Sequence, residues 1–161
     1  MLFRSEAARE AFIQAHEPFH AARADINLGV TLRMKDDPAG ALARFDRALE
    51  HVQLMPMVFA QTLSNRAEAL LDLHRFDEAA ESFARSLATL EQAGAQRAAA
   101  IVEGNLADLC GRQGRLDEAL EHFENARKKF GDADSPGDAA RLEVERAETL
   151  IQLGALADAE R

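Results

Sequence analysis

Apolar residues recur every three or four positions along most of the chain, and this pattern repeats. Three segments carry a phenylalanine in register, at Phe45, Phe83 and Phe123, and each phenylalanine follows an alanine four positions earlier. Residues four positions apart lie on one face of an α-helix, so each segment is predicted to be an amphipathic helix. The copies are spaced by 38 and then 40 residues. A repeat of this length indicates a structure built from similar units.

A second helix is predicted upstream of each phenylalanine-containing segment. Each upstream helix carries a small residue at the same position, namely Gly29, Ala67, Ala107 and, in a fourth copy, Ala147. Small residues let two helices approach closely, so each pair is predicted to form a helical hairpin. The pattern predicts seven or eight helices, at about residues 4–16, 19–35, 39–53, 57–73, 76–92, 96–113, 116–130 and 137–153.

Helix-breaking residues separate the predicted helices. They are Pro18, Pro38, Pro56, Pro136, Gly94 and Gly114. Alanine is abundant and the chain has no Trp and no Tyr, a composition that favours helices over sheets. The predicted fold class is therefore all-α.

These hairpins resemble the tetratricopeptide repeat (TPR), which combines a Leu-Gly or Leu-Ala pair in its first helix with Ala, Phe and Ala in its second. The segments NLADLCGRQGRLDEALEHFENA (105–126) and NLGVTLRMKDDPAGALARFDRA (27–48) carry the resemblance most clearly. The spacing exceeds the usual 34 residues, which predicts extra residues at the junctions between hairpins. Long repeats of this kind are similar to those of kinesin light chains, bacterial peptide-pheromone receptors and the repeat regions joined to CHAT-type caspase-like proteases in bacteria.

The resemblance implies a right-handed α-superhelix, a TPR solenoid, that forms a single domain over residues 1–161. Its parts would be a half-repeat at about 4–18, repeats at about 19–55, 56–94 and 95–133, and a partial repeat at 136–161. The partial repeat continues the pattern with Leu150, Gly154 and Ala159.

The half-repeat at the start carries Ala8, Phe12 and Ala15 at the spacing of the alanine and phenylalanine positions in the later helices. Incomplete repeats leave apolar surface that a neighbouring repeat would cover. The sequence therefore predicts either a segment of a larger protein or self-association through the helical ends.

Charge and composition exclude several classes of protein. The net charge of −9 opposes binding to a phosphate backbone, so no nucleic-acid partner is expected. No apolar run approaches the roughly 18 residues of a membrane span, and no membrane partner is expected. A single cysteine, Cys110, and the absence of an apolar leader at the start of the sequence indicate a cytoplasmic protein. The resemblance points to a bacterial source.

No catalytic or metal site is predicted, and neither is a cofactor. His16 and His20 fit the letter of the zinc-protease pattern HExxH, but Pro18 between them would break the helix that the pattern requires. Cys110 aligns with leucines of the sister repeats, which predicts a buried core position. The other histidines, His51, His74 and His122, are predicted to lie at the surface. We therefore expect a protein that is not an enzyme.

Three asparagines occupy the same position in successive first helices, at Asn27, Asn65 and Asn105. A carboxamide both donates and accepts hydrogen bonds, which suits the main chain of an extended peptide. In the architecture that the chain resembles, first helices line a concave groove, where such a ladder holds a peptide. The expected peptide-binding neighbours are Arg23, Arg33, Glu68, Asp72, Asp108, Arg112 and Arg141, together with Gln61, Ser64, Leu71 and Glu148.

The sequence thus predicts a protein–protein interaction scaffold that binds an extended, mixed-charge peptide in its concave groove. Arg23, Asn27 and the segment SNRA (64–67) also resemble part of a chaperone-binding carboxylate clamp, but Ile101 and Asn105 stand where that clamp has two cations. The alternative is a structural or regulatory spacer of a larger multidomain protein, such as a CHAT-type protease, with no ligand of its own.

Overall fold

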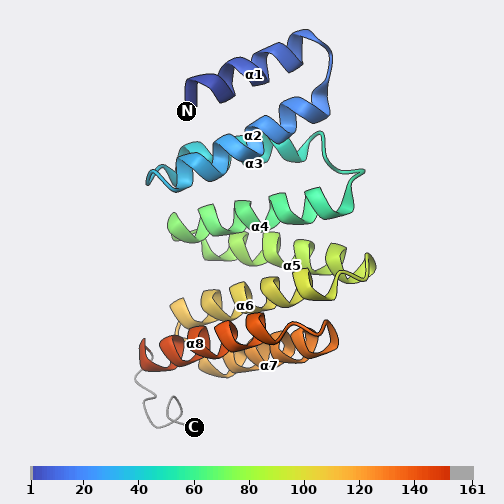
Figure 1. The fold of residues 1–161 in the computed structure, drawn as a ribbon. Helices are drawn as coiled ribbons and strands as arrows, with labels where there is room; N and C mark the ends of the chain where they lie inside the picture. Colours follow the sequence, from blue (N-terminus) through green and yellow to red (C-terminus); the bar gives the residue numbers. More distant parts are fainter. Residues whose placement is uncertain (1, 153–161) are drawn as a thin grey trace. The chain divides into compact units, whose positions relative to one another are not determined.

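The computed structural model describes residues 2–152, and all regular secondary structure in this range is helical. Eight α-helices follow one another: α1 (Leu2–Gln14), α2 (Pro18–Arg33), α3 (Pro38–Leu49), α4 (Pro56–Asp72), α5 (Phe76–Gln92), α6 (Gln96–Arg112), α7 (Leu116–Asp132) and α8 (Pro136–Gln152) (Figure 1). Every helix predicted from the apolar pattern is confirmed, with ends that differ by a few residues. Gly154 and Ala159 lie outside the described residues.

The chain divides into two compact units, Met1–Thr89 and Leu90–Arg161, which we call unit 1 and unit 2. In unit 1, α1 packs against α2, α2 against α3, and α3 against α4, and α2 also contacts α4. In unit 2, α6 packs against α7, α7 against α8, and α6 against α8. The first helices of hairpins therefore contact each other within each unit. The organisation as a single domain stays a prediction.

The phenylalanines that define the repeat form the core, as predicted. Phe45 and Phe83 are fully buried and Phe123 is 3% exposed. Gly29 shows why a small residue is needed on the first helix, because a Cβ atom there would lie 2.5 Å from Cε1 of Phe45. The Phe45 ring thus packs directly against the backbone of α2.

Prolines and left-handed residues set the helix boundaries. Pro18, Pro38, Pro56 and Pro136 are each the first residue of a helix, where the missing amide hydrogen costs nothing. Six of the seven connections between described helices contain a residue with a φ of 49 to 73°: His16, Asp36, His74, Gly94, Gly114 and Asp134. After each of them, the next amide donates to the carbonyl five residues earlier. This is the Schellman geometry of a helix C-terminus.

Two details differ from the sequence-based expectations. The junctions at 93–95 and 133–135 are short, and α4, α5, α6 and α7 each contain 17 residues, so the extra residues of these repeats lie in the helices. Only the junction at 50–55 is longer. Ala8 of α1 and Ala15 directly after the helix are exposed and Phe12 is half-buried, because no described helix covers that face.

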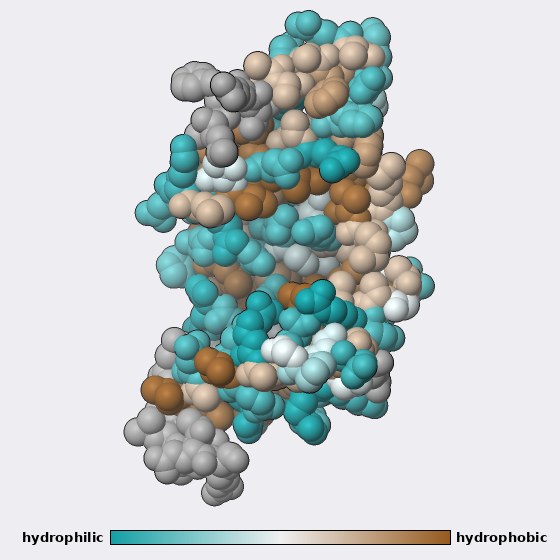
Figure 2. Space-filling view, viewed as in Figure 1, coloured by the Kyte–Doolittle hydropathy of each residue, from teal (hydrophilic) through white to brown (hydrophobic). Residues whose placement is uncertain are grey.

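Apolar side chains also reach the surface of unit 1. Figure 2 shows brown surface over α2 and α4 on the face turned to the viewer. Val30 of α2 and Met34 directly after it are 39% and 83% exposed, and Leu54 in the connection to α4 is 97% exposed. Among the helices of residues 2–152, none has the length and apolar character to cross a membrane.

Candidate functional site

One exposed stripe runs along α2 and ends just beyond it. Arg23, Asn27 and Val30 of α2 and Met34 directly after the helix are exposed, and their spacing of four, three and four residues places them on one helix face. The Arg23 guanidinium lies 6.0 Å from the centre of the Phe19 ring. Because Phe19 and Arg23 are one helical turn apart, this contact anchors the start of the stripe.

A cluster of charged residues joins α2 to α4 beside this stripe. Arg33 of α2 forms an ion pair with Glu68 of α4, and its Nε donates to the Asp72 carboxylate at 2.8 Å. All three side chains are about one-third exposed. The structure therefore brings together three of the predicted site residues, and the acidic pair carries one more charge than Arg33 neutralises.

The Glu68 carboxyl is the perturbed group of this cluster. Partial burial raises the pKa of Glu68 above its ordinary value, and the nearby Asp72 carboxylate raises it further. Arg33 lowers the pKa but does not cancel the effect of burial. A cation placed beside Glu68 would thus stabilise its charged carboxylate.

Asn65 lies on α4 at the position that Asn27 has on α2, and it is half-buried. Neither carboxamide makes a side-chain hydrogen bond to another described residue of unit 1. The expected neighbours Ser64 and Leu71 are placed differently. The half-buried Ser64 has its hydroxyl 2.9 Å from that of Ser86 on α5. Leu71 is 4% exposed, so its side chain belongs to the packed interior.

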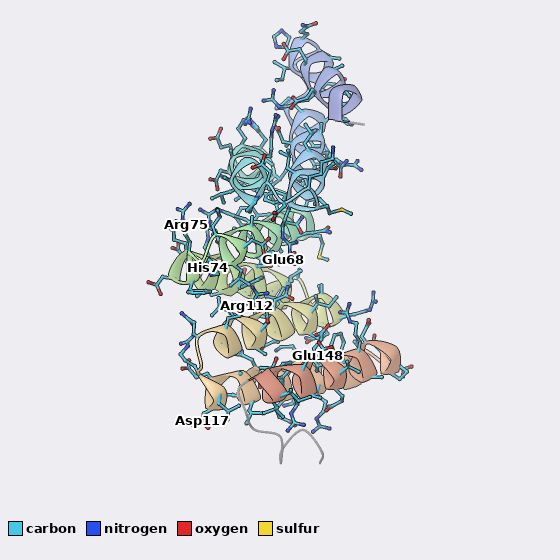
Figure 3. All side chains as sticks on the ribbon, turned by 90° about the vertical axis from the view of Figure 1, so that its left-hand side faces the viewer. Glu68, His74, Arg75, Arg112, Asp117 and Glu148 are labelled. Atoms are coloured by element: carbon cyan, nitrogen blue, oxygen red, sulfur yellow. The ribbon has the colours of Figure 1, made fainter. Side chains whose placement is uncertain are left out.

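In unit 2, Asn105 lines a polar cleft between α6 and α8. The cleft has a volume of about 220 Å³ and is also lined by Asp108, Glu145 and Glu148. Arg112 pairs with Asp108 at 2.9 Å. Figure 3 marks Arg112 on α6 and Glu148 on α8. The lining has more acids than bases, so this cleft favours a cationic group.

Arg141 and Glu145 of α8 occupy positions forty residues after Ile101 and Asn105. Arg141 is exposed, and its Nε lies 3.5 Å from the Glu145 carboxylate. An acid therefore follows the three asparagines at the fourth copy of the position. The sequence analysis missed Glu145, although extending the 40-residue spacing by one step would have found it.

Other candidate groups have structural explanations. Cys110 is 1% exposed, as predicted for a core position, and burial raises the pKa of its thiol. His16 lies in the turn before Pro18 with a φ of 56°, so the HExxH segment is not one continuous helix. Within the described residues, no group of His, Cys, Asp and Glu side chains is arranged to hold a metal ion.

His122 differs from its predicted place at the surface. Its Nδ1 is 2.8 Å from the carboxylate of Glu103, which is a buried residue of α6. Lys129 of α7 lies 3.7 Å from the same carboxylate. The histidine is thus half-buried because it pairs with an acid in the core of unit 2.

A family model described as tetratricopeptide repeat matches residues 58–130. The crystal structure of BtubC (BKLC) from P. vanneervenii has a similar fold, with a TM-score of 0.69 and 15% sequence identity over 99% of this chain and 85% of that chain. Residues 58–130 are thus tetratricopeptide-type repeats, and the helical-repeat fold of the described residues extends this architecture beyond them. No curated protein matches its sequence.

Tetratricopeptide repeats generally mediate protein–protein interaction and are typically non-catalytic scaffolds. The all-α solenoid class predicted from the sequence is confirmed. The similarity to BtubC extends to the fold alone, because the identity is low. The association with CHAT-type proteases stays a prediction, and so does the assignment of the individual peptide-binding residues.

Proposed function

We propose that this repeat protein binds an extended peptide segment along its first helices, with Asn27, Asn65 and Asn105 contacting the peptide main chain. The observation that carries the proposal is their common register at an open helix face. Asn27 lies in the exposed stripe of α2, and Asn105 lines the cleft of unit 2. Carboxamides at such positions can donate to peptide carbonyls and accept from peptide amides.

The charges beside the asparagines support a peptide of mixed charge. In unit 1, Arg23 suits an acidic side chain, and the open apolar side chains of Val30 and Met34 suit an apolar one. In unit 2, the acidic cleft around Glu148 suits lysine or arginine. The preferred ligand is therefore an extended segment that carries at least one basic residue.

The test uses peptides selected from an unbiased library against the full chain. Affinities are then measured for the wild type and for the triple variant Asn27→Ala, Asn65→Ala and Asn105→Ala. Loss of several hydrogen bonds is expected to cost about 2 kcal/mol, or roughly thirtyfold in Kd. The double variant at Asn27 and Asn65 and the single variant at Asn105 separate the two units.

Asn125 of α7 provides the matched control, because it is the one remaining asparagine of the sequence and lies on a second helix. Asn125→Ala is expected to leave the affinity within about twofold of the wild type. Circular dichroism checks that every variant remains helical. A library that yields no peptide, or binding that the triple variant retains, would contradict the proposal and favour the spacer alternative.

A further inference from the structure

A separate cavity in unit 1 shares no residue with the exposed stripe of α2. Its volume is about 510 Å³, within the usual range for pockets that hold small molecules. The walls come from α1, the connection to α2, α2 itself and the end of α3. Ile13, Pro18, Ala21 and Ala22 supply apolar surface, and the two alanines leave the space that a larger side chain would fill.

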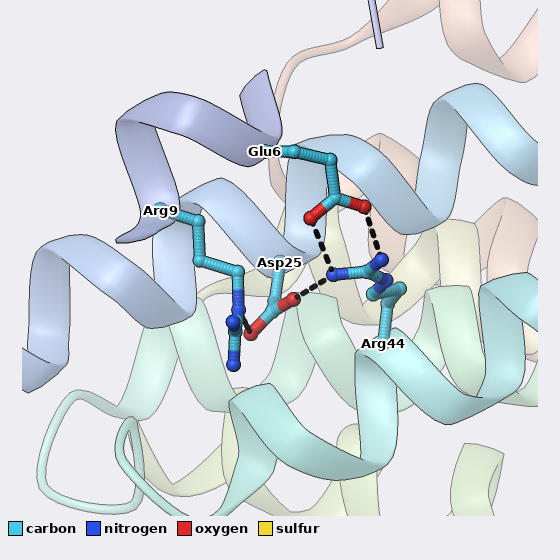
Figure 4. Close-up of polar contacts among 4 residues, drawn as sticks. All are labelled: Glu6, Arg9, Asp25 and Arg44. Atoms are coloured by element: carbon cyan, nitrogen blue, oxygen red, sulfur yellow. Dashed lines mark hydrogen bonds and ion pairs between the residues drawn. The ribbon is translucent and has the colours of Figure 1, made fainter. Parts of the chain in front are cut away.

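The buried acid of this cavity is already neutralised. Asp25 is 3% exposed, and it accepts a hydrogen bond from Arg9 at 2.7 Å and from Arg44 at 3.0 Å. Arg44 also pairs with Glu6 of α1. Figure 4 shows these four residues joined across α1, α2 and α3. Two acids and two bases therefore compensate each other, and the cluster contributes no net charge.

The second acid of the lining is Glu17, whose carboxylate is 3.0 Å from Nδ1 of His20. The second guanidinium of the lining is that of Arg47. Arg47 is exposed and makes no ion pair with another described residue of unit 1. The cavity thus combines an apolar wall with an open guanidinium.

We propose that this cavity binds a small apolar carboxylate, with its hydrocarbon part against Ile13, Ala21 and Ala22 and its carboxylate at Arg47. A guanidinium binds a carboxylate through two parallel hydrogen bonds, and His51 lies on the same lining. The site is independent of the peptide proposed above, since neither the ligand nor the lining residues are shared.

The test is calorimetric titration of the full chain with phenylacetate and with its uncharged analogue 2-phenylethanol. Phenylacetate is expected to bind with a millimolar or lower Kd. Loss of the ligand charge in 2-phenylethanol is expected to weaken binding about tenfold. Saturable binding of both compounds with equal affinity would overturn the proposal.

Variants locate the site. Arg47→Gln is expected to weaken phenylacetate binding at least about fivefold, and Ala21→Leu should abolish it by filling the cavity. Lys35→Gln, at an exposed cation of unit 1 that is not part of the lining, is the matched control and should bind like the wild type. Ala21 is buried. If Ala21→Leu does not fold, the result for Arg47→Gln, at an exposed position, decides the test. No saturable binding of phenylacetate, or unchanged binding by Arg47→Gln, would overturn the proposal.

Discussion

At Gly29, one hydrogen atom in place of a methyl group sets how closely α2 approaches α3. The Phe45 ring is fully buried, and it occupies the space that a Cβ at position 29 would take. A ring packed on all sides cannot move without leaving a void elsewhere. The Gly-Phe contact is therefore a strict requirement of the first hairpin.

We predict that Gly29→Ala lowers the free energy of unfolding by about 1–3 kcal/mol through overpacking. Gly104→Ala is the matched control, because its Cβ would lie 3.3 Å from Cδ1 of Leu142, the end of a flexible side chain. That variant should be neutral, or stabilised by up to about 1 kcal/mol through helix propensity. Urea denaturation measures both, and a Gly29→Ala variant as stable as Gly104→Ala would contradict this explanation.

Glu68 gives a pH-dependent prediction. Because burial raises the pKa of Glu68 in the folded protein, the folded state binds this proton more tightly than the unfolded state. Its contribution to stability therefore falls as the pH rises from the ordinary glutamate value, near 4.5, through the raised folded value.

Glu68→Gln should remove this slope, so the stability difference between variant and wild type should shift in favour of the variant as the pH rises through that window, and then level off. Denaturation at several pH values measures the difference. Carbon-detected NMR of the Glu68 carboxyl reports its pKa directly, and a value at or below the ordinary one would refute the explanation.

At the scale of the helices, a buried acid joins α6 to a histidine of α7. The Glu103 side chain is 5% exposed and its carboxylate is hydrogen-bonded to His122. The equivalent positions in the preceding hairpin are Leu63 and Ser82, neither of which is charged. The hairpin can thus be built with or without a buried acid. Asp25 and Arg44 repeat the acid–base arrangement in the first hairpin at 3.0 Å.

We predict that His122→Leu destabilises the chain by about 2–4 kcal/mol, because it leaves the buried Glu103 carboxylate with Lys129 alone. The double variant His122→Leu and Glu103→Leu should recover most of that loss, since no unpaired charge remains. Thermal and urea unfolding of the single and double variants gives the coupling. A double variant less stable than His122→Leu would count against this interpretation.

The sequence predicted the helices well because apolar spacing and prolines both depend on local structure. It did not predict that His16, Asp36, His74 and Asp134 adopt left-handed conformations, since such residues also occur in ordinary turns. The Glu103–His122 pair was also missed, because the residues are separated by a turn and pair only after α6 and α7 pack together. For the candidate site, the common register of the asparagines could be predicted from the sequence. The contact between Ser64 and Ser86 could not, because it forms only when α4 and α5 pack together.

At the scale of the whole molecule, we predict self-association through the open face of α1. Ala8 and Ala15 are exposed although they have the spacing of buried core positions in α3. We predict a mass that increases with concentration in light scattering, and a return to the monomer mass for the variant Ala8→Glu and Ala15→Glu, which places charges on this face. A monodisperse monomer at high micromolar concentration would argue against the prediction.

The central claim is that the asparagines of the first helices contact a bound peptide. The most direct measurement follows the side-chain amide resonances of the four asparagines by ¹⁵N NMR while a library-selected peptide is added. Hydrogen bonds to the peptide should shift the resonances of Asn27, Asn65 and Asn105 and leave Asn125 unchanged. A saturating peptide that shifts none of the three, or shifts only Asn125, would contradict the account.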